Sequence, residues 1–259
     1  MTFDPNRSPV YVVLFAVAVS GAFTAAIMAL HVATRPIVER NEELLEQRAL
    51  VELFALGDVD TMTDARIAET YRRRIRRATI NEDKPERMEL LIAYDSDRPL
   101  DEEADPTDKR GVKGYGFPIG GVGFWARIEG YLAVTPDFRR TLGVTFMRHQ
   151  ETPGLGGRIT EPEFKRWFRP GGPHPDGLDV TPPPPGEPYV RVSATSPDRS
   201  DPSYDRHVDS ITGATGTSTA VGEFINADIR RARAAAVEAG IIEGEQDSPP
   251  GEPSPGGGQ

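Results

Sequence analysis

A long apolar stretch lies near the start of the chain, and apolar and polar residues alternate in the segments after it. Residues 10–33 read VYVVLFAVAVSGAFTAAIMALHVA and contain no Asp, Glu, Lys or Arg. A helix needs about 20 apolar residues to cross the hydrocarbon core of a bilayer. A cleaved signal peptide has a shorter apolar region, of about 7–15 residues, and a small-residue cleavage site, which His31-Val32-Ala33 does not supply. We therefore expect residues 10–33 to form an uncleaved transmembrane helix in contact with the lipid bilayer.

Helical spacing of apolar residues continues after this stretch. The segment from Ile37 to Gly57 predicts a helix that ends at the glycine, with a kink or restart at Pro36. A second helix is predicted over Asp64–Ala78. We interpret residues 34–87 as a helical connector.

The remaining pattern predicts strands, with helices around them. Runs rich in apolar, aromatic and glycine residues predict strands at 88–94, two within 112–134 joined by tight turns, 141–148 and an edge strand at 189–194. Helices are expected at 161–168 and 220–240. Without a regular alternation of strands and helices, this is an α+β pattern of antiparallel strands with flanking helices.

Proline and glycine mark two further segments. Residues 170–188 form a Pro-rich insert that we expect to be a surface excursion, and residues 241–259 have the composition of a disordered tail. The predicted layout is therefore a short N-terminus at 1–9, a transmembrane helix, the connector, one domain over 88–240 and the tail.

Composition excludes several kinds of site. The net charge of −10 argues against sequence-independent nucleic-acid binding, and the basic run at 71–77 is best interpreted as a solvated helix face. The chain has no cysteine, which excludes disulfides and thiolate metal ligands. The four histidines, His31, His149, His174 and His207, show no metal-ligand spacing. We expect no metal site.

Small hydroxyl residues gather in DSITGATGTSTA, residues 209–220. One of Thr217, Ser218 and Thr219 can serve as the N-cap of the helix that follows. The cap does not explain the residues upstream, where Gly213 and Ala214 keep bulk away from the backbone. Thr215 then presents a hydroxyl just before a helix N-terminus, where unpaired N–H groups and the helix dipole favour a phosphate.

This segment resembles a known modification motif. The sequence DSITGAT, residues 209–215, is similar to the flavinylation motif of FMN-binding domains in the NqrC subunit of sodium-pumping NADH:quinone oxidoreductase and the RnfG subunit of the Rnf complex. The resemblance implies that Thr215 carries FMN through a phosphoester bond. It also implies that Thr212, Gly213 and Ala214 lie against the cofactor.

Two more segments carry the same resemblance. ETPGLG at 151–156 is similar to a family signature beside the flavin ring, although a Pro-Gly turn alone explains part of it. The resemblance implies polar ring contacts from Glu151 and Thr152, and packing on the ring by Leu155, followed by Gly156. The segment 114–119 resembles the family's GYG-x-PI sequence. Trp125 and Tyr131 are expected to be core aromatics rather than ring contacts.

The resemblance implies a membrane-anchored electron-transfer subunit, inactive alone and without catalytic residues of its own. Residues 124–168 favour an NqrC-like subunit of a sodium-translocating NADH:quinone oxidoreductase. The implied partners are the other membrane subunits of the complex and an FAD-dependent, magnesium-using FMN transferase. The implied location is the bacterial inner membrane, with a cytoplasmic N-terminus and an extracytoplasmic domain. The alternatives are an RnfG-like subunit of a ferredoxin:NAD complex, or a solitary membrane-tethered FMN-binding or assembly module.

Overall fold

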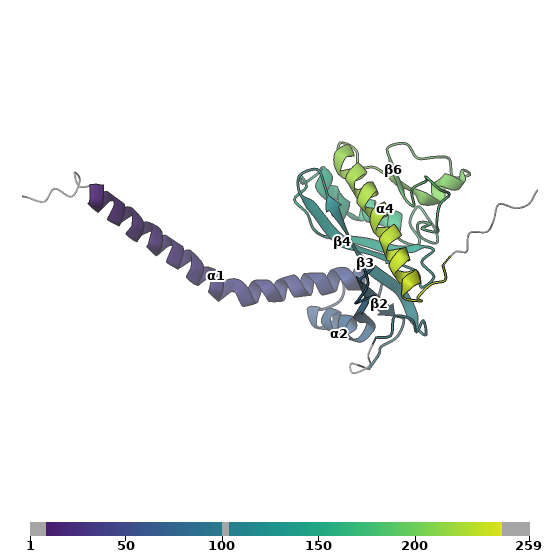
Figure 1. The fold of residues 1–259 in the computed structure, drawn as a ribbon, viewed down its shortest axis with the longest axis horizontal. Helices are drawn as coiled ribbons and strands as arrows, with labels where there is room; N and C mark the ends of the chain where they lie inside the picture. Colours follow the sequence, from purple (N-terminus) through teal and green to yellow (C-terminus); the bar gives the residue numbers. More distant parts are fainter. Residues whose placement is uncertain (1–8, 100–103, 245–259) are drawn as a thin grey trace, which may run out of the picture. The chain divides into compact units, whose positions relative to one another are not determined.

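The fold is taken from a computed structural model that describes residues 9–99 and 104–244 (Figure 1). Residue contacts divide the chain between Glu46 and Gln47 into two units. The first unit is the greater part of α1 (Pro9–Leu53), which continues through Pro36. Its apolar stretch reaches a mean hydropathy of 2.3, and by length and composition it can cross a membrane. Residues 1–8 of the predicted N-terminus (1–9) and residues 245–259 of the predicted tail (241–259) lie outside the described residues.

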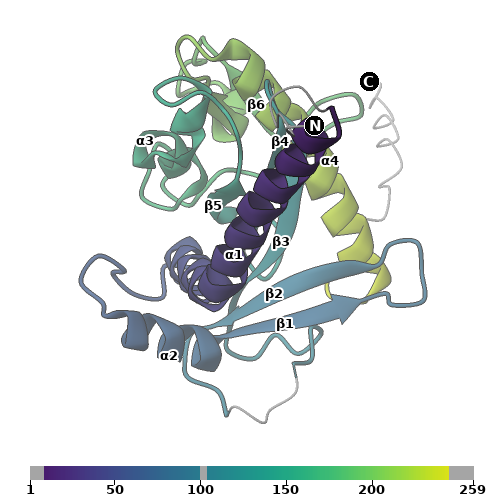
Figure 2. The ribbon, with the colours of Figure 1, turned by 90° about the vertical axis from the view of Figure 1, so that its left-hand side faces the viewer.

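An antiparallel sheet organises the second unit. Its strands are β1 (Ile75–Ile80), β2 (Met88–Tyr94), β3 (Val112–Val122), β4 (Arg127–Val134) and β5 (Thr141–Arg148), and their order in space is their order in the chain (Figure 2). Every neighbouring pair is antiparallel. The expected α+β class with antiparallel strands is confirmed.

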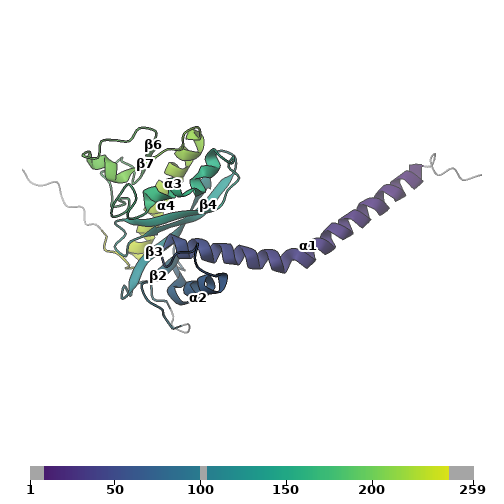
Figure 3. The same ribbon diagram turned by 180° about the vertical axis from the view of Figure 1, so that it is seen from behind.

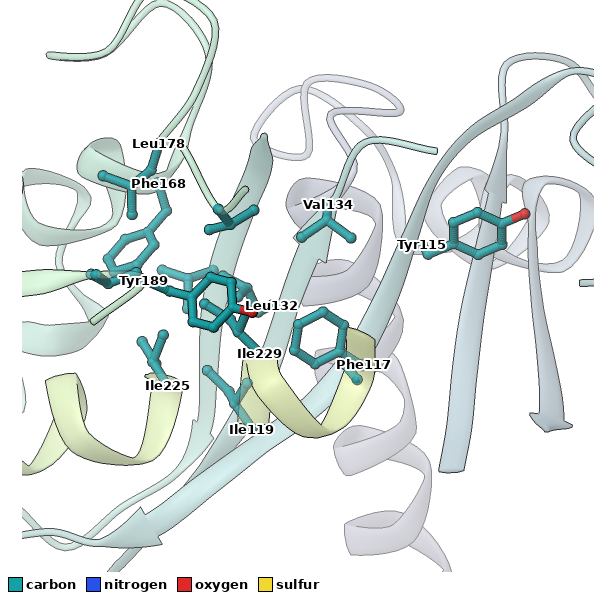
Figure 4. Close-up of a cluster of buried hydrophobic side chains, with 14 of the residues drawn as sticks. Tyr115, Phe117, Ile119, Leu132, Val134, Phe168, Leu178, Tyr189, Ile225 and Ile229 are labelled. Carbon is teal, nitrogen blue, oxygen red and sulfur yellow. The ribbon is translucent and has the colours of Figure 1, made fainter. Parts of the chain in front are cut away.

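The two faces of the sheet are covered by different helices. Leu91 and Ala93 of β2 share a buried cluster with Leu50 and Phe54 at the end of α1. Leu90 and Ile92 belong to the larger cluster on the other face, which α4 (Thr215–Glu238) covers. Figure 4 shows Ile225 and Ile229 of α4 beside residues of β3 and β4 such as Ile119 and Leu132. Successive side chains of a strand point to opposite faces of the sheet. Both faces are buried at β2, and its residues are therefore apolar nearly throughout.

The predicted second helix is too long. The helix α2 (Asp64–Arg74) begins at its cap Thr63, whose hydroxyl accepts from the Arg66 N–H, and it ends at Arg74 rather than Ala78. Strand β1 follows at once, so residues 34–87 are not wholly helical. Pairing with β2 and burial of Ile75 and Ile80 outweigh the helical preference of the arginines between them.

Two arginines of the basic run connect the β1 edge of the sheet to the end of β2 and the segment after it by hydrogen bonds. Arg74 donates to the carbonyls of Tyr94, at 3.0 Å, and Asp95, at 2.7 Å. Arg76 donates to the carbonyl of Pro99 at 2.8 Å. The run is therefore part of the fold and not simply a solvated helix face.

The Pro-rich segment is not a surface excursion throughout. His174, Leu178 and Val180 are buried in it, and the Thr141 N–H donates to the Leu178 carbonyl at 3.0 Å. The predicted edge strand is short: β6 (Arg191–Ser193) pairs in parallel with β7 (His207–Asp209) (Figure 3). Short helices complete the unit: η1 (Gly156–Thr160), α3 (Pro162–Lys165), η2 (Arg166–Phe168) and η3 (Pro202–Arg206).

The last helix begins and ends differently from the prediction. Helix α4 starts at Thr215, not at Ala220, because the small residues of the hydroxyl-rich segment form its first turn. After it, Ile241 and Ile242 are buried in the core, so the ordered chain extends past Gly240. The early start of α4 matters most, since it places Thr215 in the helix instead of before it.

Candidate functional site

A pocket of about 170 Å³ lies where three segments meet: the turn between β3 and β4, the loop after β5 and the first turn of α4. Its lining residues are Phe124, Trp125, Glu151, Thr152, Leu155, Gly156, Gly213, Ala214, Thr215, Gly216 and Thr217. All the site residues expected from the sequence are therefore brought together except Thr212, which is exposed and is not part of the lining. The lining includes no Lys or Arg.

The first turn of α4 offers unpaired backbone donors. The first bond of the helix runs from the Ser218 N–H to the Ala214 carbonyl, at 3.0 Å, so the N–H groups of residues 215–217 have no acceptor within the helix. The cap residue Ala214 supplies no side-chain hydrogen bond. Together with the positive end of the helix dipole, these groups favour a phosphate at this position.

Only some hydroxyls of the segment face the pocket. Thr215 is exposed, lines the pocket and has no hydrogen bond among the described residues. Thr217 is buried and donates to Glu151. Ser218 is buried too, and its Oγ accepts from the Ile211 N–H at 3.0 Å. The hydroxyl available for a ligand or for covalent chemistry at this turn is therefore that of Thr215.

Glycines let the two loops approach each other. Gly213 has φ of 80°, and a Cβ there would lie 3.3 Å from Leu155 Cδ2. Gly154 has φ of 73°, in a turn where the Leu155 N–H donates to the Thr152 carbonyl at 3.1 Å. Because left-handed backbone suits glycine, this turn can place Leu155 against the start of α4.

A buried carboxylate joins the three segments. Glu151 is 4% exposed. Its Oε1 accepts from the Trp125 N–H at 3.1 Å, and its Oε2 accepts from the Thr217 hydroxyl. The sequence predicted a ring contact for Glu151, whereas both of its oxygens already bind other parts of the chain.

Two exposed aromatic residues form the outer wall. Phe124 and Trp125 are 62% and 66% exposed, and their rings meet edge to face with centroids 5.1 Å apart. The Trp125 Nε1–H donates to Thr152 Oγ1 at 3.0 Å, so the indole is fixed beside the pocket. The expectation that Trp125 belongs to the core is wrong. Tyr131, in contrast, is half-buried against the cluster at the end of α1.

Phe124 was not expected at the site from the sequence. The available signal was the pair Phe-Trp between Gly123 and the start of the next strand, because a tight turn at the tip of two strands leaves its side chains in solvent. Exposed apolar residues that gather at one place indicate a binding surface.

These residues suit a flavin mononucleotide. Trp125 and Leu155 offer apolar surfaces to a planar ring, and the first turn of α4 offers donors to a phosphate. The Thr215 hydroxyl lies at the same turn. Over residues 9–99 and 104–244, no group of three or more His, Asp or Glu side chains could hold a metal ion.

Comparison with known proteins agrees with this site. Residues 123–229, which include every lining residue, match the family model described as FMN-binding domain. The expected resemblance to this family is confirmed. The matched segment begins at the β3–β4 turn and ends within α4, so it contains the whole pocket.

The curated relatives are NqrC proteins of Na(+)-translocating NADH-quinone reductase. The protein of Pseudomonas aeruginosa is 32% identical over 111 residues, which are 42% of this chain and 39% of the relative. The protein of Chlamydia pneumoniae is 48% identical over 52 residues, 20% of this chain and 16% of the relative. The matched stretches thus cover less than half the length of these relatives.

Solved structures show the same fold. The structure of NqrC from Shewanella oneidensis aligns with a TM-score of 0.54 at 19% identity, covering 73% of this chain and 91% of the other. The corresponding protein of Na(+)-translocating NADH-quinone reductase from Parabacteroides distasonis aligns with a TM-score of 0.53, also at 19% identity, covering 80% and 96%. The segment that matches the family model therefore lies in a fold similar to that of these NqrC structures.

Proposed function

We propose that Thr215 carries FMN in a phosphoester bond and that the protein is an electron-transfer subunit of a membrane-bound redox complex. One observation carries the proposal. Thr215 presents an exposed hydroxyl in the pocket, at a helix start with unpaired N–H groups, while the hydroxyls of Thr217 and Ser218 are buried and engaged. The family match over residues 123–229 supports FMN as the ligand.

The attachment reaction requires a donor of the FMN group. We propose FAD as the donor and a separate magnesium-using transferase as the catalyst. The Thr215 Oγ attacks the phosphorus on the riboflavin side of the pyrophosphate, a new Oγ–P bond forms, the pyrophosphate P–O bond breaks, and AMP leaves. The hydroxyl proton passes to a base of the transferase or to solvent. The N–H groups of the first turn then face the phosphate oxygens of the product.

The chain's own residues position the cofactor. FMN supplies the redox chemistry when bound, accepting and donating electrons at its ring. Trp125 and Leu155, which line the pocket from two different segments, would hold the ring by apolar contact. Thr152 keeps the indole in place through its hydroxyl, at 3.0 Å from Nε1. We also propose that Thr212 of the motif contacts the cofactor from outside the pocket lining.

The proposed setting is an NqrC-like subunit of a sodium-translocating NADH:quinone oxidoreductase in the bacterial inner membrane. The names of the relatives and the shared fold support this assignment over the RnfG-like one. Residues 10–33 would span the bilayer and residues 1–9 would lie in the cytoplasm. The domain over residues 88–240 would lie on the extracytoplasmic side of the membrane. The other membrane subunits would deliver and remove the electrons.

The attachment is tested by mass spectrometry of the full chain, produced in a host that contains the transferase. An added FMN mass is expected on the peptide with Thr215, and it is expected to be lost in Thr215→Ala. The matched control is Thr219→Ala, an exposed threonine of the same helix that is expected to leave the label in place. A wild-type protein without the added mass, or a label that persists in Thr215→Ala, contradicts the proposal.

The choice of complex needs a second experiment. The full chain is isolated from its native membrane with its partners, and oxidation of NADH by quinone is measured with and without sodium. Sodium-dependent quinone reduction is the expected result. Reduction of NAD by ferredoxin would instead assign the subunit to an Rnf-like complex, and isolation without redox partners would favour the solitary module.

A further inference from the structure

We propose that the buried hydrogen bond between Thr217 and Glu151 is a positioning link. It holds two segments that line the pocket, the β3–β4 turn and the loop after β5, in place relative to Thr215. The inference rests on the proposed function in assigning a flavin ring to the pocket, but the link itself is a property of the chain alone. Thr217 is a positioning residue here, since its hydroxyl faces Glu151 and not the open side of the pocket.

The burial of the carboxylate gives the link its importance. Glu151 is 4% exposed and Thr217 is 3% exposed. A buried carboxylate is costly unless donors satisfy its oxygens. Donors from two other segments reach it: the Trp125 N–H, at 3.1 Å from one oxygen, and the Thr217 hydroxyl on the other. Glu151 therefore holds its place only while the β3–β4 turn and α4 hold theirs.

The glycines around the carboxylate show how closely the link is enclosed. A Cβ on Gly156 would lie 2.4 Å from Thr217 Oγ1 and 2.7 Å from Glu151 Oε2. A Cβ on Gly123 would lie 2.5 Å from Glu151 Oε1. Both distances to the carboxylate are shorter than real Cβ contacts, so a methyl group added at either glycine would force the carboxylate or its neighbours to shift. The second glycine of ETPGLG thus has a packing role that a Pro-Gly turn does not explain.

The link connects the three elements that would touch the cofactor. Through Oε1 it fixes the backbone of Trp125, whose indole is also tied to Thr152. Through its own backbone it fixes the loop that carries Leu155. Through Oε2 it fixes the first turn of α4, two residues after Thr215. Loss of the Thr217 hydroxyl leaves a buried oxygen without its donor, and the loop must open to let water replace it.

The test compares three variants of the full chain in detergent. Thr217→Val keeps the shape and removes the donor, Thr217→Ser restores the donor, and Thr219→Val removes an exposed hydroxyl from the same helix turn as the matched control. Amide hydrogen exchange is followed in the unlabelled protein. The reporters are the Trp125 N–H and the amides of residues 151, 152 and 154–158, including the turn amides of Leu155 and Gly157.

In Thr217→Val, exchange of these reporters is expected to be about tenfold faster or more, because a hydrogen bond to a charged group closes the loop. Amides of β2 and β3 are expected to keep their protection, which shows that the domain remains folded. Thr217→Ser and Thr219→Val are expected to match the wild type. Unchanged reporters in Thr217→Val, or acceleration spread equally over the sheet, would overturn the inference.

A second readout uses the FMN-labelled protein. Quenching of flavin fluorescence by iodide is expected to increase severalfold in Thr217→Val and to return to the wild-type value in Thr217→Ser. Unchanged quenching in a fully labelled Thr217→Val protein would overturn the effect on the ring. If the wild type takes up no FMN, the proposed function fails, and the exchange experiment still decides whether the link exists.

Discussion

The end of α1 packs on the sheet through apolar residues and also contributes one paired carboxylate, Glu52, whose titration makes a testable prediction. Glu52 Oε1 accepts from Lys165 Nζ at 3.0 Å and from Arg169 Nη2 at 2.7 Å. Burial alone would raise the pKa of Glu52, but the hydrogen bonds and charges of Lys165 and Arg169 outweigh it and lower the pKa below its usual value. The perturbation is Glu52→Gln, which keeps the size of the side chain and removes the charge.

The size of the effect follows from the exposure of the three side chains. Glu52, Lys165 and Arg169 are 31%, 12% and 34% exposed, so the network is partly screened by solvent. A hydrogen bond between charged groups contributes about 1.5–3 kcal/mol when buried, and exposed ion pairs contribute at most about 1 kcal/mol. We expect Glu52→Gln to cost about 1–2 kcal/mol at neutral pH. For a unit of this size, each kcal/mol lowers the Tm by about 2–4 °C.

The sign of the pH dependence is fixed by the lowered pKa. The stability from Glu52 is fully present above its unfolded-state pKa, near 4.5, and is lost as the pH falls through the lower folded-state pKa. The cost of Glu52→Gln is therefore expected at pH 7 and should shrink below about pH 4.5. The assay is thermal unfolding of the full chain in detergent, followed by circular dichroism between about pH 3 and 7.

The control for this assay is Glu163→Gln, an exposed carboxylate on the neighbouring helix α3. It should change the Tm little at any pH. Equal Tm values for Glu52→Gln and the wild type at pH 7, or a difference between them that does not depend on pH, would refute the reasoning.

Two other changes give clear expectations. Gly156→Ala should cost about 1–3 kcal/mol of stability by overpacking, because its Cβ would meet Thr217 Oγ1 at 2.4 Å. We expect a lower Tm and reduced FMN incorporation in the mass-spectrometric assay. An unchanged Tm together with full labelling would contradict the packing argument. Asp228→Asn keeps an acceptor for the Gly120 N–H, at 2.8 Å in the wild type, and removes a carboxyl whose pKa burial raises. A raised pKa contributes stability at low pH that is lost as the pH rises, so thermal unfolding should show the Asn variant gaining on the wild type from about pH 3 to 6; a constant difference would contradict this.

The sheet could be predicted from the sequence because its signal is local. Residues 88–94 and 141–148 were predicted as strands with the bounds that β2 and β5 have in the structure. The end of α2 could not be predicted in the same way. Residues 72–77 are mostly arginine, a good helix former, and only the pairing of residues 75–80 with β2 turns the chain from helix to strand at Ile75. A contact with a distant segment overrides the local preference there.

The site, like the fold, could be predicted from the sequence only where the signal is local. Motif resemblance selected Thr215 and the segment 151–156, and the structure brings them into one pocket. The pairing of Glu151 with Thr217 joins residues 66 positions apart in the chain, and no local pattern predicts it. Trp125 was assigned to the core because tryptophan is usually well buried. Its position at the tip of a strand turn, which only the register of β3 and β4 defines, places it in solvent instead.

The lack of basic side chains in the pocket lining supports the proposed covalent bond at Thr215. No Lys or Arg lines the pocket, so the phosphate of a free flavin nucleotide would be held by the first turn of α4 without a neutralising side chain. A helix N-terminus contributes only about 0.3–1 kcal/mol to holding an anion at an exposed position. Trp125 and Leu155 are themselves open to solvent, so the ring contacts add limited burial. The proposed bond at Thr215 would compensate for this weak hold on the phosphate, and the open wall would leave the ring within reach of the electron-transfer partners that the proposed function requires.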